Sequence, residues 1–150
     1  MINITDKHKC CGCSACFSIC PKHCIEMRAD YEGFLYPKVN KEECIDCGLC
    51  EKVCPVINQN APHQPENVYA VKNKNTETRL NSSSGGVFSL IAEKIIEEKG
   101  VVFGARYDDN WNVVMDFAET LEDVKAFRNS KYVQCFVGDS YLHVEKFLKA

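Results

Sequence analysis

Residues 10–21 of the chain read CCGCSACFSICP, and residues 44–55 repeat the same cysteine and proline spacing as CIDCGLCEKVCP. Eight of the eleven cysteines belong to this repeat. They are Cys10, Cys13, Cys16, Cys20, Cys44, Cys47, Cys50 and Cys54. In each copy, three thiols two residues apart can converge from one short loop, whereas the following proline turns the fourth away. The repeat therefore predicts two metal-binding loops of the same kind.

This spacing resembles that of bacterial ferredoxins that carry two 4Fe–4S clusters. In such proteins the fourth cysteine of each run binds the cluster of the other run. The resemblance therefore implies one cluster on Cys10, Cys13, Cys16 and Cys54, and a second on Cys44, Cys47, Cys50 and Cys20. The function it predicts is the transfer of single electrons.

Two other uses of paired cysteines fit the chain less well. A zinc site takes four ligands from two cysteine pairs and would leave half of the repeat unexplained. A disulfide framework needs an oxidising compartment, but the segment Met1–Lys7 has no apolar signal region and the cysteine count is odd. These features favour a cytoplasmic iron–sulfur protein.

Charge and hydropathy narrow the range of partners. The formal net charge of −3 gives no basic surface for nucleic acid. No apolar run reaches the roughly 20 residues that a membrane span needs. Each cluster bound by four thiolates adds about two negative charges. We therefore expect a redox partner protein or subunit with positive charge on its docking face, and neither nucleic acid nor a membrane span.

The repeat defines an N-terminal domain over residues 1–57. Between its two copies, residues 25–39 read as two short strands that turn at residues 31–33. A unit of this size has little apolar core of its own. We expect the clusters to supply the core, so that this domain unfolds without iron and sulfide. Residues 58–67 are polar and contain two prolines, which is typical of a linker.

Residues 68–150 alternate between strand and helix patterns and predict an α/β domain. The expected strands are 68–71, 101–105, 112–119 and 132–137; the expected helices are 87–99, 120–127 and a last one from Asp139 or Ser140. Val87, Leu90, Ile91 and Ile95 mark the apolar face of the first helix. The last helix runs into Ala150 without a capping Gly or Asn, so we expect this domain to be incomplete. The fold class predicted for the whole chain is α+β.

Three segments of this second half also resemble a known family. Residues 83–89, 101–105 and 130–134 are similar to the N-terminal domain of the coenzyme F(420) hydrogenase/dehydrogenase beta-subunit family, and many members carry a ferredoxin unit in front. The resemblance implies a flavin enzyme, in which FAD exchanges a hydride with a deazaflavin or other hydride carrier. The clusters would pass single electrons to or from FAD. The family continues into a C-terminal region that is absent here.

Small residues before the first helix of this half are candidates for cofactor contact: Ser83, Ser84, Gly85 and Gly86. They let a ligand approach the backbone, and the amides of a helix start favour a phosphate or pyrophosphate. Lys131 could meet a phosphate or a ring. The alternative is a serine N-cap with flexible glycines and a solvated lysine.

Three cysteines lie outside the repeat. Cys11 could exchange with Cys10 as a ligand, and Cys24 could reach a cluster from one helical turn beyond Cys20; the alternative is that both are spare small residues. Cys135 fits a buried strand position.

A second function stays open beside the flavin enzyme. The chain could be a ferredoxin-type electron carrier with an appended docking domain and no catalysis of its own. Flavin binding separates the two functions, because only the enzyme requires it.

Overall fold

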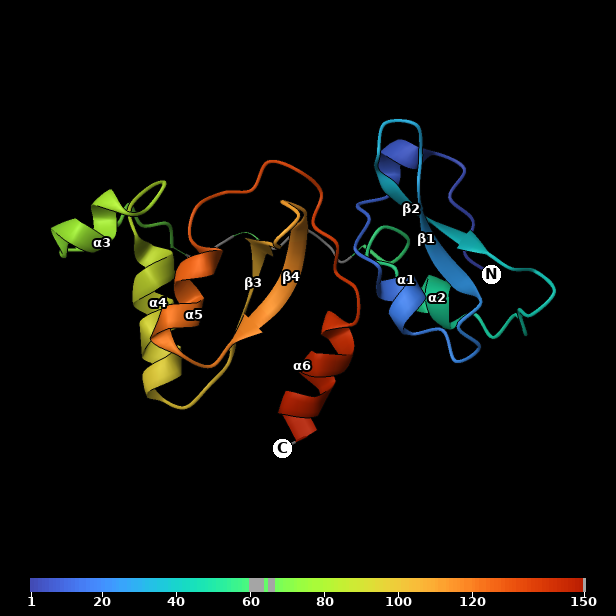
Figure 1. The fold of residues 1–150 in the computed structure, drawn as a ribbon. Coiled ribbons are helices and arrows are strands. Elements are labelled where there is room, and N and C mark those ends of the chain that lie inside the picture. The colour runs from blue at the N-terminus through green and yellow to red at the C-terminus, as the bar shows by residue number, and fades with distance from the viewer. Residues whose placement is uncertain (60–63, 65–66, 150) are drawn as a thin grey trace. The chain divides into compact units, whose positions relative to one another are not determined.

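The computed structural model describes residues 1–59, 64 and 67–149 (Figure 1). The chain divides into two compact units. The first consists of Met1–His63 with Val137–Ala150, and the second of Gln64–Phe136. The predicted linker lies over 58–67, and residues 60–63 and 65–66 of it are outside the described residues.

The first unit contains the predicted hairpin between the two cysteine runs. Strands β1 (Ile25–Ala29) and β2 (Leu35–Val39) pair in antiparallel register. Gly33 has φ +90°, a backbone conformation that glycine adopts without a steric penalty. The Asp30 carboxylate accepts hydrogen bonds from the backbone N–H groups of Glu32 and Phe34. The turn chemistry therefore closes the hairpin where the sequence predicts it.

The first unit also contains helices. They are the 3-10 helix η1 (Lys7–Lys9), α1 (Ala15–Ser18), α2 (Leu49–Lys52) and α6 (Ser140–Lys149). α1 contacts α2, β1 and α6. The last helix begins where the sequence predicts, but the structure groups it with the N-terminal unit, whereas sequence reasoning assigned it to the second half.

Thiols make up most of the first unit's core. Seven of its residues are buried together: Ile2, Cys16, Cys20, Cys24, Ile25, Cys50 and Cys54. Five of these seven are cysteines, so only two ordinary aliphatic side chains are fully buried in this cluster. The packing of this unit is therefore inseparable from what its sulfur atoms bind.

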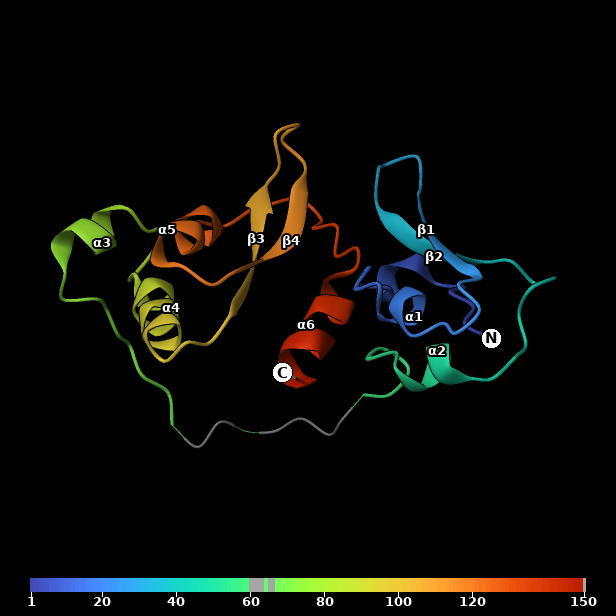
Figure 2. The same cartoon turned by 60° about the horizontal axis from the view of Figure 1, so that its bottom comes forward.

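The second unit packs helices against an antiparallel hairpin. Its elements are α3 (Thr76–Leu80), α4 (Val87–Glu97), β3 (Val102–Tyr107), β4 (Val113–Ala118), α5 (Leu121–Val124) and the 3-10 helix η2 (Lys125–Phe127). Both views show α4 and α5 side by side next to the two strands (Figures 1 and 2). The buried core consists of Ala92, Val102, Ala118, Val124 and Phe127.

The helix over 120–127 begins as predicted. Thr120 is the N-cap of α5, and its hydroxyl accepts the backbone N–H of Asp123 at 3.2 Å. The same hydroxyl donates to the Asp123 carboxylate. The continuation through η2 ends at Phe127, which confirms the predicted end.

Two expected strands differ in the structure. Residues 68–71 form no strand, and their apolar side chains are exposed, because no neighbouring strand in the described part of the chain pairs with them. The expected strand 132–137 is reduced to one parallel bridge between Phe136 and Val114. The parallel pairing typical of an α/β domain is thus confined to this bridge among the described residues. The mixed helix and strand content is as predicted.

The buried face of α4 agrees only in part with the predicted one, because Ile95 packs against the core as expected but Leu90 and Ile91 do not. Leu90 and Ile91 are 54% and 56% exposed, whereas Ser89 and Ala92 are each only 1% exposed. Small side chains at these two positions let the helix approach its neighbours closely, and this outweighs the apolar pattern. None of the helices in the described ranges combines the length and the apolar character needed to cross a bilayer.

A substitution at Gly104 tests the close packing of the second unit. A Cβ atom at Gly104 would lie 2.5 Å from the buried ring of Phe127. We expect Gly104→Ala to lower the free energy of unfolding of the second unit by about 1–3 kcal/mol, the usual cost of overpacking. Urea unfolding followed by the fluorescence of Trp111, the single tryptophan, reports on this unit. Phe127→Leu in the same variant should restore part of the loss, and an unchanged midpoint for Gly104→Ala would contradict the contact.

Candidate metal centres

Both cysteine loops use left-handed backbone at equivalent places. The residue before the second cysteine has positive φ in each loop, Gly12 at +64° and Asp46 at +50°. The residue after the second cysteine does so too, Ser14 at +60° and Gly48 at +75°. These turns curl the chain, so that thiols two residues apart face one centre. The sequence repeat is therefore also a repeat of backbone conformation.

The third and fourth cysteines of each loop are placed by a short helix. Cys16 lies in α1 and Cys50 in α2. The N–H of Cys20 then donates to the carbonyl of Phe17, and the N–H of Cys54 donates in the same way to that of Glu51. The two motifs thus end in matching turns, after which each chain leaves through its proline.

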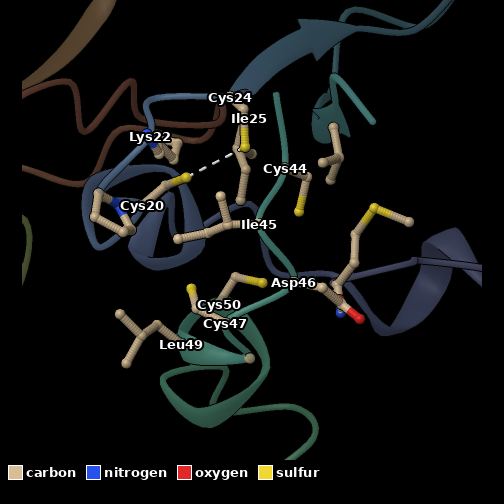
Figure 3. Close-up of a pocket in the computed structure, with 14 residues that line it drawn as sticks. Cys20, Lys22, Cys24, Ile25, Cys44, Ile45, Asp46, Cys47, Leu49 and Cys50 are labelled. Carbon is tan, nitrogen blue, oxygen red and sulfur yellow. Dashed lines mark hydrogen bonds and ion pairs between the residues drawn. The ribbon is translucent and has the colours of Figure 1, made fainter. Parts of the chain in front are cut away.

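The thiols gather around two hollows. The first is lined by Cys10, Cys11, Cys13, Cys16 and Cys54, and the second by Cys20, Cys24, Cys44, Cys47 and Cys50 (Figure 3). The structure therefore brings the fourth cysteine of each run to the first three of the other run. Ligation itself stays a prediction from the spacing.

Apolar side chains and backbone donors surround these sulfur atoms. Ile25, Val39 and Leu49 line the second hollow. The N–H of Ile2 donates to the Sγ atom of Cys50 at 3.3 Å. Such N–H···S bonds and a dry lining are the means by which a protein tunes a cluster's potential.

Burial and hydrogen bonds act in opposite directions on the thiols. Burial raises the pKa of the Cys16 thiol to about 11. Burial also acts to raise the pKa of Cys20, but backbone N–H donors at Cys24 and Lys22 outweigh it and lower this pKa. A lowered pKa favours the thiolate, which is the form that binds a metal.

The donor set fits cubane clusters better than a mononuclear ion. All eleven cysteines are free of disulfides. Within the described ranges, no three His, Cys, Asp or Glu side chains are positioned to hold one metal ion together. In a cubane each thiolate binds a different iron, so the four sulfurs surround the cluster and need not meet at a point. A zinc site, by contrast, needs all four ligands around one ion.

A third hollow, of about 250 Å³, lies at the start of α4 in the second unit. It is lined by Ser82, Ser83, Ser84, Gly86, Val87, Phe88, Ser89, Phe127, Arg128, Asn129 and Ser130. Three of the five residues predicted to contact a cofactor are among them, and Gly85 and Lys131 are not. The sequence did not predict that Ser89 and Arg128 line this hollow. Ser89 lies inside α4, and Arg128 lies some forty residues further along the chain than Ser89.

The turn that opens α4 is held by a buried asparagine. Gly86 is the N-cap with φ +71°, and no side chain caps the helix, so the alternative of a serine N-cap is wrong. The backbone N–H of Asn73 donates to the carbonyl of Gly85, and its side-chain amide to that of Gly86. The helix start is therefore left without an internal side-chain acceptor.

Two buried polar atoms of residues that line this hollow have no partner in the described structure. They are the Oγ of Ser89, a residue that is 1% exposed, and the Nε of Arg128. Lys131 donates instead to the carbonyls of Ala126 and Arg128 at 3.0 and 2.7 Å, and burial lowers the pKa of its ammonium. Lys131 thus fixes the backbone that carries Arg128. Buried donors without partners are rare, and they mark a place where a ligand can supply the acceptor.

Comparison with known families identifies the N-terminal region that carries the cysteine runs. Residues 9–58 match the family described as 4Fe-4S dicluster domain, and residues 40–101 match a second family of the same description. The N-terminal region is a two-cluster domain of the ferredoxin type. Residues 55–101 contain no cysteine, so the second match depends on the second cysteine run. No curated protein matches the chain.

The ferredoxin-type domain has one neighbour that sequence reasoning missed. Tyr141 of α6 lies at the first cysteine loop, where burial and the sulfurs of Cys13 and Cys11 raise the pKa of its hydroxyl. α6 also contacts α1. No local signal in residues 140–149 indicates this contact, because the segment lies more than a hundred residues beyond the loop.

Removing iron and sulfide should unfold the ferredoxin-type domain, since five of its seven core residues are cysteines. Amide hydrogen exchange measured by mass spectrometry, with and without the clusters under anaerobic conditions, checks this prediction. We expect amides in residues 1–59 to lose protection, whereas those of α4, β3 and β4 keep it as an internal control. Protection retained throughout the hairpin β1–β2 in metal-free protein would contradict the prediction.

Proposed function

We propose that the chain is the electron-transferring part of a flavin-dependent oxidoreductase, related to the coenzyme F(420) hydrogenase/dehydrogenase beta-subunit family. Iron–sulfur electron transfer is the established part of this function, through the two 4Fe-4S dicluster matches. The flavin is the proposed part. The proposed domains are 1–57 for the clusters, 58–67 for the linker, and 68–150 for the flavin-facing domain.

The proposed ligands follow the grouping of thiols around the two hollows. One cluster takes Cys10, Cys13, Cys16 and Cys54, and the other takes Cys44, Cys47, Cys50 and Cys20. When bound, such clusters supply one-electron transfer. The residues around them exclude water, hold the sulfurs in place and donate N–H bonds that set the potential.

The hollow at α4 is the observation that carries the flavin proposal. It combines a helix start without a capping side chain, the serines of residues 82–84, and the unpartnered donors Ser89 and Arg128. Backbone amides at a helix start and a guanidinium favour a phosphate or pyrophosphate. The pyrophosphate of FAD has this chemistry, and the redox partner of FAD would be a deazaflavin or another hydride carrier.

The second candidate function is an electron carrier with a docking domain. It is supported by the same family matches, which concern iron and sulfide alone. The eleven cysteines form no disulfides, which suits a reducing compartment. We therefore propose a cytoplasmic location for the chain under both candidate functions.

Alanine variants of single cysteines test the proposed ligands. Cross-ligation predicts that Cys54→Ala and Cys13→Ala lose the same cluster, whereas Cys47→Ala loses the other. Iron analysis should show about eight irons per chain in the parent and about four in each variant. Electron paramagnetic resonance of the reduced variants should give matching spectra for the first pair and a different one for Cys47→Ala. If Cys54→Ala matched Cys47→Ala instead, each run would hold its own cluster.

FAD binding tests the second site. We expect the anaerobically purified chain to bind FAD, and Arg128→Ala to weaken binding about tenfold or more, as expected when a charge-assisted hydrogen bond is lost. Lys125→Ala is the matched control, because this lysine lies on η2 but does not line the hollow. Calorimetric titration gives the affinities. About eight irons without any FAD binding would leave the electron carrier as the function.

A further inference from the structure

Asn73 contacts the start of α4 without lining the hollow there. It is 7% exposed, and its backbone and side-chain polar groups all form hydrogen bonds. The backbone N–H donates to the carbonyl of Gly85 at 2.7 Å, and the side-chain amide donates to that of Gly86 at 3.3 Å. The side-chain oxygen accepts the N–H of Asn75, and the carbonyl accepts the guanidinium of Arg79 at 2.9 Å. Asn73 is thus anchored to α3 on one side and holds the turn before α4 on the other.

Gly85 takes part in the same contact. A Cβ atom at Gly85 would lie 2.7 Å from the carbonyl oxygen of Val71, two residues before Asn73. Only glycine allows two backbone segments to meet this closely. The sequence predicted that Gly85 contacts a cofactor, but in the structure this residue packs against the segment that carries Asn73 and does not line the hollow.

The two hydrogen bonds from Asn73 fix the direction of two peptide groups. In a planar trans peptide the C=O and the N–H point in opposite directions, and no cis peptide bond occurs in the described part of the chain. The carbonyls of Gly85 and Gly86 point to Asn73, so the N–H groups of Gly86 and Val87 point away from it. Gly86 and Val87 both line the hollow. Because these N–H groups begin α4, they have no acceptor within the helix.

A buried side chain adds a further donor to the hollow. Ser89 is 1% exposed, and its Oγ has no hydrogen-bond partner among the described residues. Ser82 differs, because its hydroxyl already donates to the carbonyl of Thr78 at 2.7 Å. The guanidinium of Arg128 can only donate. This set of donors favours a ligand group that only accepts hydrogen bonds, such as an ionised phosphoryl group.

We propose that Asn73 is a positioning residue of this site. By holding the carbonyls of Gly85 and Gly86, it presents the N–H groups of Gly86 and Val87 to a phosphoryl group of the ligand. The hollow thereby selects the phosphate or pyrophosphate of a cofactor, because carbonyl oxygens turned into it would repel phosphoryl oxygens. The inference rests on the proposed function, in which this hollow takes the pyrophosphate of FAD.

Binding of inorganic pyrophosphate to the full, anaerobically purified chain tests the role of Asn73. Calorimetric titration should show that the parent binds pyrophosphate and that Asn73→Asp weakens binding about tenfold or more. An ionised aspartate still accepts the N–H of Asn75, but it cannot donate to Gly86. Asn75→Asp is the matched control, since it makes the same change of charge two residues away and aspartate caps α3 as well as asparagine does. Parent affinity in Asn73→Asp would overturn the inference.

A second variant separates the lost donor from the added charge. Asn73→Leu removes the donor and adds no charge, and we expect it to weaken pyrophosphate binding at least several-fold. Parent affinity in Asn73→Leu would assign the effect of Asn73→Asp to charge and overturn the inference. Urea unfolding followed by the fluorescence of Trp111 shows whether the second unit of each variant is folded.

A measurement on the parent chain needs no variant. In nuclear magnetic resonance spectra, hydrogen bonds to a phosphoryl group should move the amide protons of Gly86 and Val87 downfield when pyrophosphate is added. The amide proton of Asn75, which donates to Asn73, should keep its position. A purely structural role of Asn73 does not predict these shifts, and unchanged positions for both amides would overturn the inference.

Binding of FAD distinguishes this inference from the proposed function. If the parent binds FAD and both Asn73 variants bind it with parent affinity, the inference is refuted and the flavin proposal stands. If the parent binds pyrophosphate with the expected dependence on Asn73 but does not bind FAD, the flavin proposal is refuted and the inference stands. A parent that binds neither compound refutes both.

Discussion

The bond between cysteine sulfur and iron is the interaction on which the ferredoxin-type domain depends. An ordinary domain of this size would need a dense aliphatic core. Here two isoleucines and five cysteines form the buried cluster, so the packing is centred on sulfur. The left-handed residues on either side of the second cysteine, such as Gly12 and Gly48, curl the backbone so that the thiols face one centre. Secondary structure around the cysteine loops is correspondingly short: the hairpin β1–β2 and the single-turn helices α1 and α2.

In the second unit, by contrast, small residues let the backbone approach neighbouring side chains and helices closely. The lack of a side chain at Gly104 leaves room for the ring of Phe127. The small side chains of Ser89 and Ala92 allow the neighbours of α4 to approach closely. This packing leaves the larger side chains Leu90 and Ile91 outside. It also buries the hydroxyl of Ser89 without a partner at the hollow where Arg128 lies. Tight packing and an unsatisfied polar group therefore occur in the same helix.

Sequence reasoning succeeds here where chemistry is local. The cysteine spacing, the turn at Gly33 and the Thr120 cap each depend on residues within a few positions of one another. It fails for strand 68–71, because a strand exists only where another strand pairs with it. It also misses Arg128 and Tyr141, whose positions depend on tertiary contacts of η2 and α6. For α4, the period of 3.6 residues identifies a helix, but the choice of buried face depends on which side chains are small enough to allow contact.

The first unit is made of two stretches that are far apart in the sequence, and this affects the order in which its parts are synthesised. The cysteine loops and the hairpin leave the ribosome early, whereas α6, with Tyr141, belongs to the same unit and follows after the whole second unit. The second unit, Gln64–Phe136, lies between the two parts, and at about 5–20 residues per second its 73 residues take on the order of 4–15 s. During that interval the first cysteine loop is complete in sequence, whereas the helix that contacts α1 has not yet been made.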